Sequence, residues 1–186
     1  HVAARLGDQR RVGRDAINQA ACGGSPWAAS FLDSFRFVNQ LGLMAQNGVQ
    51  VVMHNTLAAS DYALIDGDTR RPRPNYFAAV LWKRIMGQTV LAPPASPAPD
   101  MRIYAHCLAG VPGGVGLAVI NLGMAEMPLP VDHAQVYMMQ AMPLDSGTVT
   151  VNGSEPGLAT DGSLIAVQAA SNLRTAAAVA ELKQLE

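Results

Sequence analysis

Carboxylate side chains are the first candidates for chemistry, because acid/base cleavage of a sugar usually needs two of them, one protonated and one ionised. The sequence has only four glutamates, which are Glu126, Glu155, Glu181 and Glu186. We expect all four to be solvated, since Asp and Glu side chains are mostly exposed. Asp61 is more interesting, because it lies beside Tyr62 after a predicted strand, where βα folds place ligands. A turn at Ser60-Asp61 explains the same aspartate equally well.

His54 and Asn55 are polar residues at the end of an apolar run that begins at Val49. Side chains in that position either line a pocket or cap the loop that follows. The other three histidines are scattered without the spacing of metal ligands, so we expect no metal site. Neither a phosphate loop nor a dinucleotide fingerprint is present, and we expect no cofactor.

Cys22-Gly23-Gly24 comes directly before a predicted helix, where bare backbone N–H groups can approach an anion at the positive helix end. A carboxylate would suit this place, although a tight turn also uses two glycines. Tyr62 either donates its hydroxyl to the same anion or packs beneath its loop. Cys22 has two interpretations of its own, a thiol nucleophile beside His54 or a small buried thiol.

Two helices and a strand must position these residues. A helix is predicted from Ser25-Pro26 to about Gly48, since apolar residues recur there at steps of three or four. The run 49–53 predicts a strand, and the apolar stripe within 77–85 predicts a second helix that ends before Gly87. This order, with short connections, is typical of parallel sheets and βα-barrels.

The chain changes character at residues 92–100, where four prolines in nine residues resist both helix and central strand. Beyond this connector, Arg102, Tyr104 and His106 alternate with apolar residues and predict a strand with one wet face. The apolar run 115–122 predicts a central strand. Two weaker strands and a C-terminal helix are expected at 135–140, 148–151 and 175–186. Together these strands predict an antiparallel β-sandwich.

The composition and charge of the chain indicate which classes of protein and partner are excluded. Hydrophobic residues are 49% of the chain and charged residues 15%, which supplies a core and excludes disorder as the main state. The formal charge of -1 predicts no nucleic-acid partner. No apolar run approaches the roughly 20 residues of a membrane span, and the first residues carry no signal peptide. Cys22 and Cys107 allow at most one disulfide and do not fix the compartment.

Three segments of the chain form an ordered set, QAACGGSPWAASFLDSFRFVNQLG, GVQVVMHNTLAASDYALID and RPRPNYFAAVLWKRIMGQTVL. Their specific parts are CGG, VVMHN, SDY and PNY followed by a helix and MG. The set resembles glycoside hydrolase family 79, which contains heparanase and related β-glucuronidases. The resemblance covers roughly residues 19–122 and fades towards 153.

The resemblance implies a retaining glycosidase that cleaves bonds to glucuronic acid, built as a (β/α)₈ TIM barrel followed by an antiparallel β-sandwich. Residues 1–87 would be the last βα units of the barrel, and residues 88–186 the sandwich, with an atypical tail from about 155. The implied partners are a glucuronic-acid-containing saccharide and the missing N-terminal barrel segment. The family also suggests a secreted or periplasmic protein.

By the same resemblance, Gly23, Gly24 and Tyr62 clasp the sugar carboxylate. His54 and Asn55 would face this pocket from the end of the eighth barrel strand, with Asp61 in the loop beside Tyr62. Several relatives have tyrosine where this chain has Cys22.

The resemblance leaves the chain without catalytic residues. The position of the nucleophilic glutamate matches Ile17, and the nearby Asp15 is two residues out of register, too far for a near-attack geometry. The acid/base glutamate is expected upstream of His1. Residues 1–18 and the tail after about 154 depart from the family, which predicts a truncated or out-of-frame product with exposed sheet edges and poor solubility.

Two functional hypotheses follow. In the first, the chain is the C-terminal portion of a heparanase-like β-glucuronidase that contacts the substrate carboxylate but supplies no catalytic glutamate. In the alternative, the sandwich is a non-catalytic accessory module that contacts carbohydrate or assists folding. A thiol hydrolase using Cys22 and His54 is a third possibility and predicts inactivation by a thiol alkylator.

Overall fold

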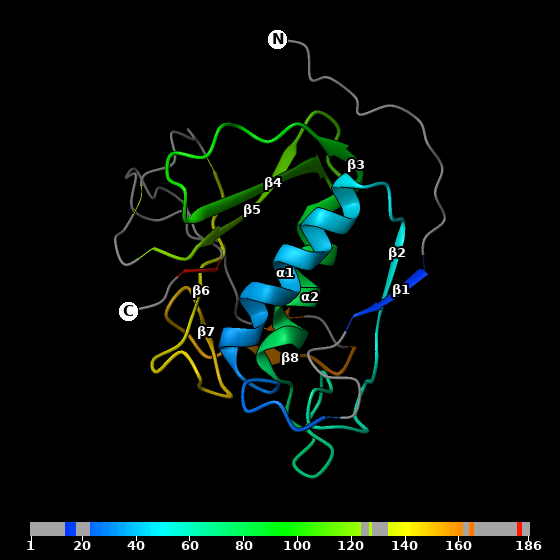
Figure 1. Cartoon of the computed structure of the whole chain (residues 1–186), viewed down its shortest axis with the longest axis vertical. Coiled ribbons are helices and arrows are strands. Elements are labelled where there is room, and N and C mark those ends of the chain that lie inside the picture. Colours follow the sequence, from blue (N-terminus) through cyan, green and yellow to red (C-terminus); the bar gives the residue numbers. More distant parts are fainter. Residues whose placement is uncertain are drawn as a thin grey trace.

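The computed structural model describes residues 14–17, 23–123, 127, 134–161, 164–165 and 182–183, and the described residues form an α+β arrangement (Figure 1). The elements in chain order are β1 (Arg14–Ile17), α1 (Phe31–Gln46), β2 (Val51–His54), α2 (Pro74–Ile85), β3 (Met86–Leu91), β4 (Met101–Leu108), β5 (Val115–Asn121), β6 (Met139–Gln140), β7 (Thr150–Val151), β8 (Gly157–Leu158), β9 (Leu164–Ile165) and β10 (Leu182–Lys183). The two helices lie in the middle of the view, with β1 and β2 on one side and β4 and β5 on the other.

Helix α1 ends at Gln46 as predicted but begins at Phe31, later than Ser25-Pro26 indicates. The preceding residues form a turn instead, in which the Ser30 N–H and hydroxyl both donate to the Trp27 carbonyl. Trp27 is about half exposed (52%), whereas Phe31 is fully buried. The predicted start is therefore wrong, because the buried face of the helix begins with Phe31.

The start of α1 is capped by a distant part of the main chain. Ser30 occupies the N-cap position without a side-chain cap bond. The N–H groups of Phe31 and Leu32 instead donate to the carbonyls of Ser146 and Leu144, at 2.8 and 2.9 Å. These bonds satisfy helix N–H groups that would otherwise have no partner, and they attach the 144–146 loop to the helix.

Helix α2 contains the predicted apolar stripe and ends before Gly87 as predicted. Pro74 is at its first position, where the missing N–H costs nothing. Phe77, Leu81 and Ile85 are buried on one face. The chain then enters β3 directly, a strand that the sequence analysis did not predict.

A buried polar cluster joins α1 to α2. The Asn75 side chain donates to Asp33 Oδ2 (2.7 Å), and its carbonyl oxygen accepts the Ser34 hydroxyl (2.8 Å). Asp33 is 1% exposed and also accepts two hydrogen bonds from Arg36. A buried carboxylate is tolerated only when its oxygens are satisfied in this way, so the cluster fixes how the two helices pair.

The large sheet has the order β3-β4-β5-β10-β6-β7. Its described pairs are antiparallel except those of β10, which runs parallel to both β5 and β6. Both helices pack against one face of this sheet, and one apolar core contains side chains from α1, α2 and the strands β3 to β7. The predicted central strand is confirmed as β5. The core crosses the predicted boundary near residue 88, and the boundary itself stays a prediction.

Strand β4 does not have the wet face that the alternation predicts. Arg102 is exposed, but Tyr104 and His106 are buried at 3% and 5% exposure. The reason is the helical layer: the Tyr104 ring lies against Gly42 of α1, where a Cβ atom would collide with it, and its hydroxyl donates to Asn39 (2.7 Å). Burial raises the pKa of Tyr104.

The opposite face of the sheet carries a smaller apolar cluster of Met101, Ile103 and Val119. Ala98 of the proline-rich connector packs against it. The connector is therefore irregular, as predicted, but it also covers part of the sheet.

Strands β1 and β2 form a separate parallel pair, with Ile17 opposite His54. Parallel pairing agrees with the helix-then-strand order predicted for this part of the chain. Residues 14–17 are thus a strand, although the sequence analysis found no barrel-like strand in 1–18. Whether the pair belongs to a barrel stays a prediction.

The predicted C-terminal helix is wrong at Leu182–Lys183, which form β10 between β5 and β6. Pairing with two strands outweighs the helical propensity at these positions. The rest of 175–186 lies outside the described residues. None of the helices in the described ranges is long and apolar enough to cross a membrane.

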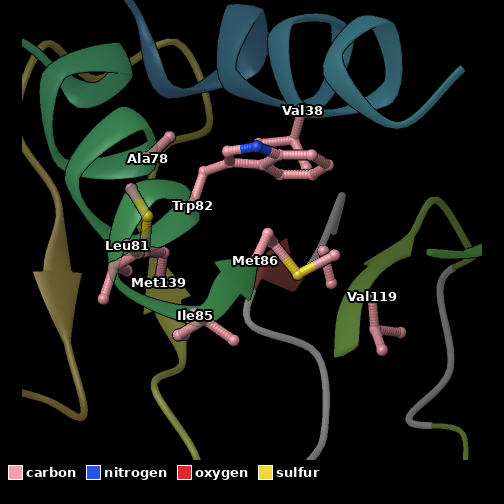
Figure 2. Close-up of a pocket in the computed structure, with 9 residues that line it drawn as sticks. Val38, Ala78, Leu81, Trp82, Ile85, Met86, Val119 and Met139 are labelled. Carbon is pink, nitrogen blue, oxygen red and sulfur yellow. The ribbon is translucent and has the colours of Figure 1, made fainter. Parts of the chain in front are cut away.

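The interior of the core is nearly filled. A cavity of about 20 Å³ lies among Val38, Trp82, Met86 and neighbouring apolar side chains (Figure 2). The Trp82 indole spans the gap between the two helices, below Val38. This space is enough for about one water molecule and is too small for a sugar.

Replacing Asn75 with alanine tests the helix clamp. We expect Asn75→Ala to lower the free energy of unfolding by about 2–3 kcal/mol, because a buried carboxylate oxygen loses its partner. Asn47→Ala is the control, since Asn47 is exposed and, among the described residues, its side chain bonds only to the carbonyl of Leu43 one turn earlier. Chemical denaturation of both variants measures the difference. Equal losses of unfolding free energy in the two variants would show that the buried Asn75 bond contributes no more to stability than the exposed Asn47 bond.

Strand β2 should promote self-association of the isolated chain. Val51 and Met53 are 45% and 48% exposed on a strand that pairs only with β1 among the described residues. We expect the double variant Val51→Thr and Met53→Thr to shift the chain towards monomer in sedimentation velocity. Val115→Thr is the control, because Val115 is 57% exposed on the doubly paired β5. A wild-type chain that is monomeric and unfolds in one sharp thermal transition would contradict the prediction.

Candidate functional site

The predicted site residues come from three segments: the glycine turn before α1, the end of β2, and the loop 55–73 that leads to α2. Two hydrogen bonds bring these segments together. The Gly24 N–H donates to Asp61 Oδ2 at 2.6 Å, across 37 positions of sequence. The His54 ring donates through Nε2 to the Tyr62 carbonyl at 2.8 Å. Gly24, Asp61, His54 and Tyr62 are therefore neighbours in the folded chain.

Gly23 and Gly24 form a turn that requires glycine. Their φ angles are +83° and +85°, a region that side chains rarely allow. A Cβ atom on Gly23 would also lie 2.7 Å from Asp61 Oδ1. The group that lies against the glycines in this structure is the Asp61 carboxylate, and a sugar carboxylate at this place stays a prediction. Cys22 lies outside the described residues.

Asp61 lies in a turn that the main chain itself holds, with the Ala63 N–H donating to the Ser60 carbonyl (3.1 Å). The predicted turn is therefore present. The Asp61 carboxylate does not close it, because that group reaches across to Gly24. Asp61 is exposed, so solvent or a ligand can reach the same carboxylate.

His54 ties β2 to the loop. A carbonyl oxygen only accepts hydrogen bonds, so Nε2 carries the proton in its bond to Tyr62. The other ring nitrogen, Nδ1, is buried without a partner in the described part of the chain and is left as an acceptor. The ring stands edge-on to Phe37 of α1, with centroids 5.6 Å apart. His54 thus has the capping role that the sequence analysis proposed as one of two.

Tyr62 is buried, at 7% exposure. Within the described residues its hydroxyl has no hydrogen-bond partner, while its carbonyl accepts from His54. The ring therefore packs beneath the loop, which was one of the two predicted roles, and the hydroxyl stays available as a donor. Asn55 is exposed directly after His54.

Arg73 organises the loop, a role that the sequence analysis missed. Its guanidinium donates to the carbonyls of Ser60, Asp61 and Ala63 and pairs with the Asp66 carboxylate at 2.9 Å. Carbonyl groups that converge on one guanidinium hold the turn around Asp61 and Tyr62 in place. The only signal in the sequence is an arginine directly before the proline that starts α2.

Asp66 shapes the other end of this loop. Hydrogen bonds from the Thr69 N–H and hydroxyl, and then from Arg73, hold the pKa of Asp66 far below its usual range. A lowered pKa in the folded state means that the contribution to stability is complete above the unfolded pKa of about 4 and is lost as the pH falls below it. The loop should therefore keep its shape at neutral pH.

The described residues supply no glutamate to this site. Ile17, the position implied for the nucleophile, lies opposite His54 in the β1–β2 pair, and Asp15 lies opposite Val52. Of the four glutamates only Glu155 is described, and it lines another cavity of about 660 Å³ together with Arg71 and Gln140. None of the predicted site residues lines that cavity. Within the described ranges no three His, Cys, Asp or Glu side chains come close enough to hold a metal ion.

The chain is similar in sequence to heparanase-like and glucuronidase proteins. It is 41% identical over 100 residues to "Heparanase-like protein 1" of Arabidopsis thaliana and 34% identical over 92 residues to "Baicalin-beta-D-glucuronidase" of Scutellaria baicalensis. These matches cover 54% and 50% of this chain but only 18% and 17% of the two relatives. No protein-family model matches the chain.

A longer match is to "Inactive heparanase-2" of Homo sapiens, which is 27% identical over 173 residues, 80% of this chain and 29% of that protein. Together the three matches confirm the predicted relationship to heparanase and glucuronidase proteins. The chain spans less than a third of each of these relatives. The similarity therefore concerns a part of those proteins, and it includes one that is named as inactive.

Replacing Arg73 with methionine tests its hold on the loop. We expect Arg73→Met to speed hydrogen exchange of the Ile65 N–H about tenfold, because that group bonds within the loop, to the Leu57 carbonyl. Arg71→Met is the control, since Arg71 is exposed and its guanidinium makes no hydrogen bond to the described residues. Exchange measured by NMR distinguishes the two. Equal rates in the wild type and Arg73→Met would contradict the role.

Proposed function

We propose that this chain is the sugar-binding part of a retaining glycoside hydrolase of the heparanase type, which cleaves glycosidic bonds to glucuronic acid. Its first portion would be the last βα units of a (β/α)₈ barrel, and the portion after residue 88 would belong to a β-sandwich. The parallel pair of β1 and β2 around α1 supports the barrel assignment. The names of the relatives, a heparanase-like protein and a glucuronidase, support the substrate class.

The observation that carries this proposal is the hydrogen bond between Gly24 and Asp61. It joins two of the segments on which the resemblance rests, and His54 joins the end of β2 to the Tyr62 carbonyl. In the folded chain the glycine turn donates its N–H to a carboxylate, that of Asp61. The turn therefore has the chemistry that a uronic acid needs, one carboxylate oxygen on a backbone donor.

In the bound state we expect the sugar carboxylate to lie against the Gly23-Gly24 turn, with the Tyr62 hydroxyl as a second donor. His54, Asn55 and Asp61 would line the same place. These residues bind and orient the sugar, and none of them is placed as a nucleophile or acid.

Cleavage with retention needs two carboxyl groups about 5–5.5 Å apart. The described residues place no such pair at this site, and the resemblance implies no catalytic glutamate in this chain. We therefore expect the chain by itself to bind glucuronate without hydrolysing glucuronides. The catalytic carboxylates would come from outside the described residues.

The alternative function is a non-catalytic carbohydrate-binding or folding role. One observation favours it: the chain matches a relative named as inactive over 80% of its length. The alternative assigns this role to the predicted sandwich after residue 88, so it places no sugar site at the glycine turn, and neither function predicts turnover by the chain alone. Glucuronate binding that Gly24→Ala weakens would favour the first function, and carbohydrate binding that Gly24→Ala leaves unchanged would favour the alternative.

Gly24→Ala tests the binding site directly. The wild-type chain should bind glucuronate more tightly than glucose in isothermal titration calorimetry, and Gly24→Ala should weaken glucuronate binding about tenfold, because alanine at φ +85° displaces the donor N–H. Gly113→Ala is the matched control, since Gly113 has φ +76° and, like Gly24, open space around its Cβ position.

Two results would contradict the proposal. Equal affinity of the wild type and Gly24→Ala for glucuronate would remove the glycine turn from the site. Turnover of a chromogenic glucuronide by the chain alone would show that its own residues supply the catalytic groups.

A further inference from the structure

We propose that Asp61 competes with the substrate's carboxylate for the Gly24 N–H and thereby sets the preference of this site between acidic and uncharged sugars. The inference rests on the proposed function, because it concerns the same glycine turn. It goes further by naming a residue that opposes the binding of the acidic group.

Both oxygens of the Asp61 carboxylate lie against the glycine turn. Oδ2 accepts the Gly24 N–H at 2.6 Å, a short bond of the kind formed by charged acceptors. Around the Cβ position of Gly23, Oδ1 and Oδ2 lie at 2.7 and 3.0 Å. The side chain thus occupies the surface where a sugar carboxylate would have to bind.

The main chain around Asp61 is held in place, so the contact does not depend on the side chain alone. Arg73 binds the carbonyls of Ser60 and Asp61, and the Ala63 N–H closes the turn. Arg73 makes its ion pair with Asp66, and in the described part of the chain no cation pairs with the Asp61 carboxylate. Asp61 therefore meets an incoming anion with no counter-charge from the described residues.

One N–H group cannot serve two carboxylates at the same time. A second carboxylate at the turn would lie beside Asp61, and like charges that share a site oppose each other's ionised form. An acidic sugar must therefore displace Asp61 from Gly24. An uncharged sugar has no such cost, because its hydroxyls can donate to Asp61 where it stands.

Asp61→Asn removes the charge and keeps the shape, and its amide oxygen can still accept the Gly24 N–H. Asp68→Asn is the matched control, since Asp68 is exposed in the same loop and its carboxylate makes no hydrogen bond to the described residues. The probes are sodium glucuronate and its uncharged methyl ester, measured by isothermal titration calorimetry on the whole chain. Thermal melts of both variants establish that they fold.

We expect Asp61→Asn to bind glucuronate about tenfold more tightly than the wild type and the methyl ester within twofold of it. Asp68→Asn should match the wild type for both probes. Equal glucuronate affinity in Asp61→Asn and the wild type would overturn the inference and leave the proposed function intact. An equal gain for the ester would also overturn it, since charge would not be the cause. Failure of all three proteins to bind glucuronate would overturn the proposed function together with the inference.

Discussion

The buried contact between Asp33 and Asn75 is the constraint on which the rest of the site depends. Asn75 of α2 donates to the Asp33 carboxylate of α1 at 2.7 Å. The segment that carries His54, Asp61 and Tyr62 runs from the end of α1 to the start of α2. Fixing the two helices therefore fixes both ends of that segment. A carboxylate that is 1% exposed costs free energy to bury. The hydrogen bonds from Asn75 and Arg36 offset this cost, and the bond from Asn75 joins the two helices.

Three consecutive residues at the start of α2 hold the loop, begin the helix and join it to α1. Arg73 binds the carbonyls of the loop, Pro74 begins the helix, and Asn75 reaches Asp33. The loop and the helix pair are thus linked through a single short stretch of main chain. This arrangement means that the position of Asp61 is determined by residues that do not touch a ligand.

The sequence predicts elements well where the signal is local. Helix α2 follows from its apolar stripe, and β2 and β5 follow from their apolar runs. The start of α1 could not be predicted, because its first N–H groups bond to Leu144 and Ser146, more than a hundred positions away. The burial of Tyr104 and His106 depends in the same way on the helices that cover β4. Periodicity within one strand does not report what covers it.

The candidate site, too, could be predicted from the sequence only where the signal is local. Residue types and their order bring attention to the glycine turn, His54 and the Asp61-Tyr62 loop, and the structure places these residues next to one another. That Asp61 itself occupies the glycine turn, and that Arg73 holds the loop, depends on contacts between distant segments. No pattern in the sequence contains that information.

A crystal structure of the chain with bound glucuronate would test the central claim most directly. The account predicts that the sugar carboxylate accepts the Gly24 N–H near the Tyr62 hydroxyl and that the Asp61 side chain has moved away from the turn. A glucuronate bound elsewhere, for example beside Arg71 in the 660 Å³ cavity, with Asp61 still on Gly24, would contradict it.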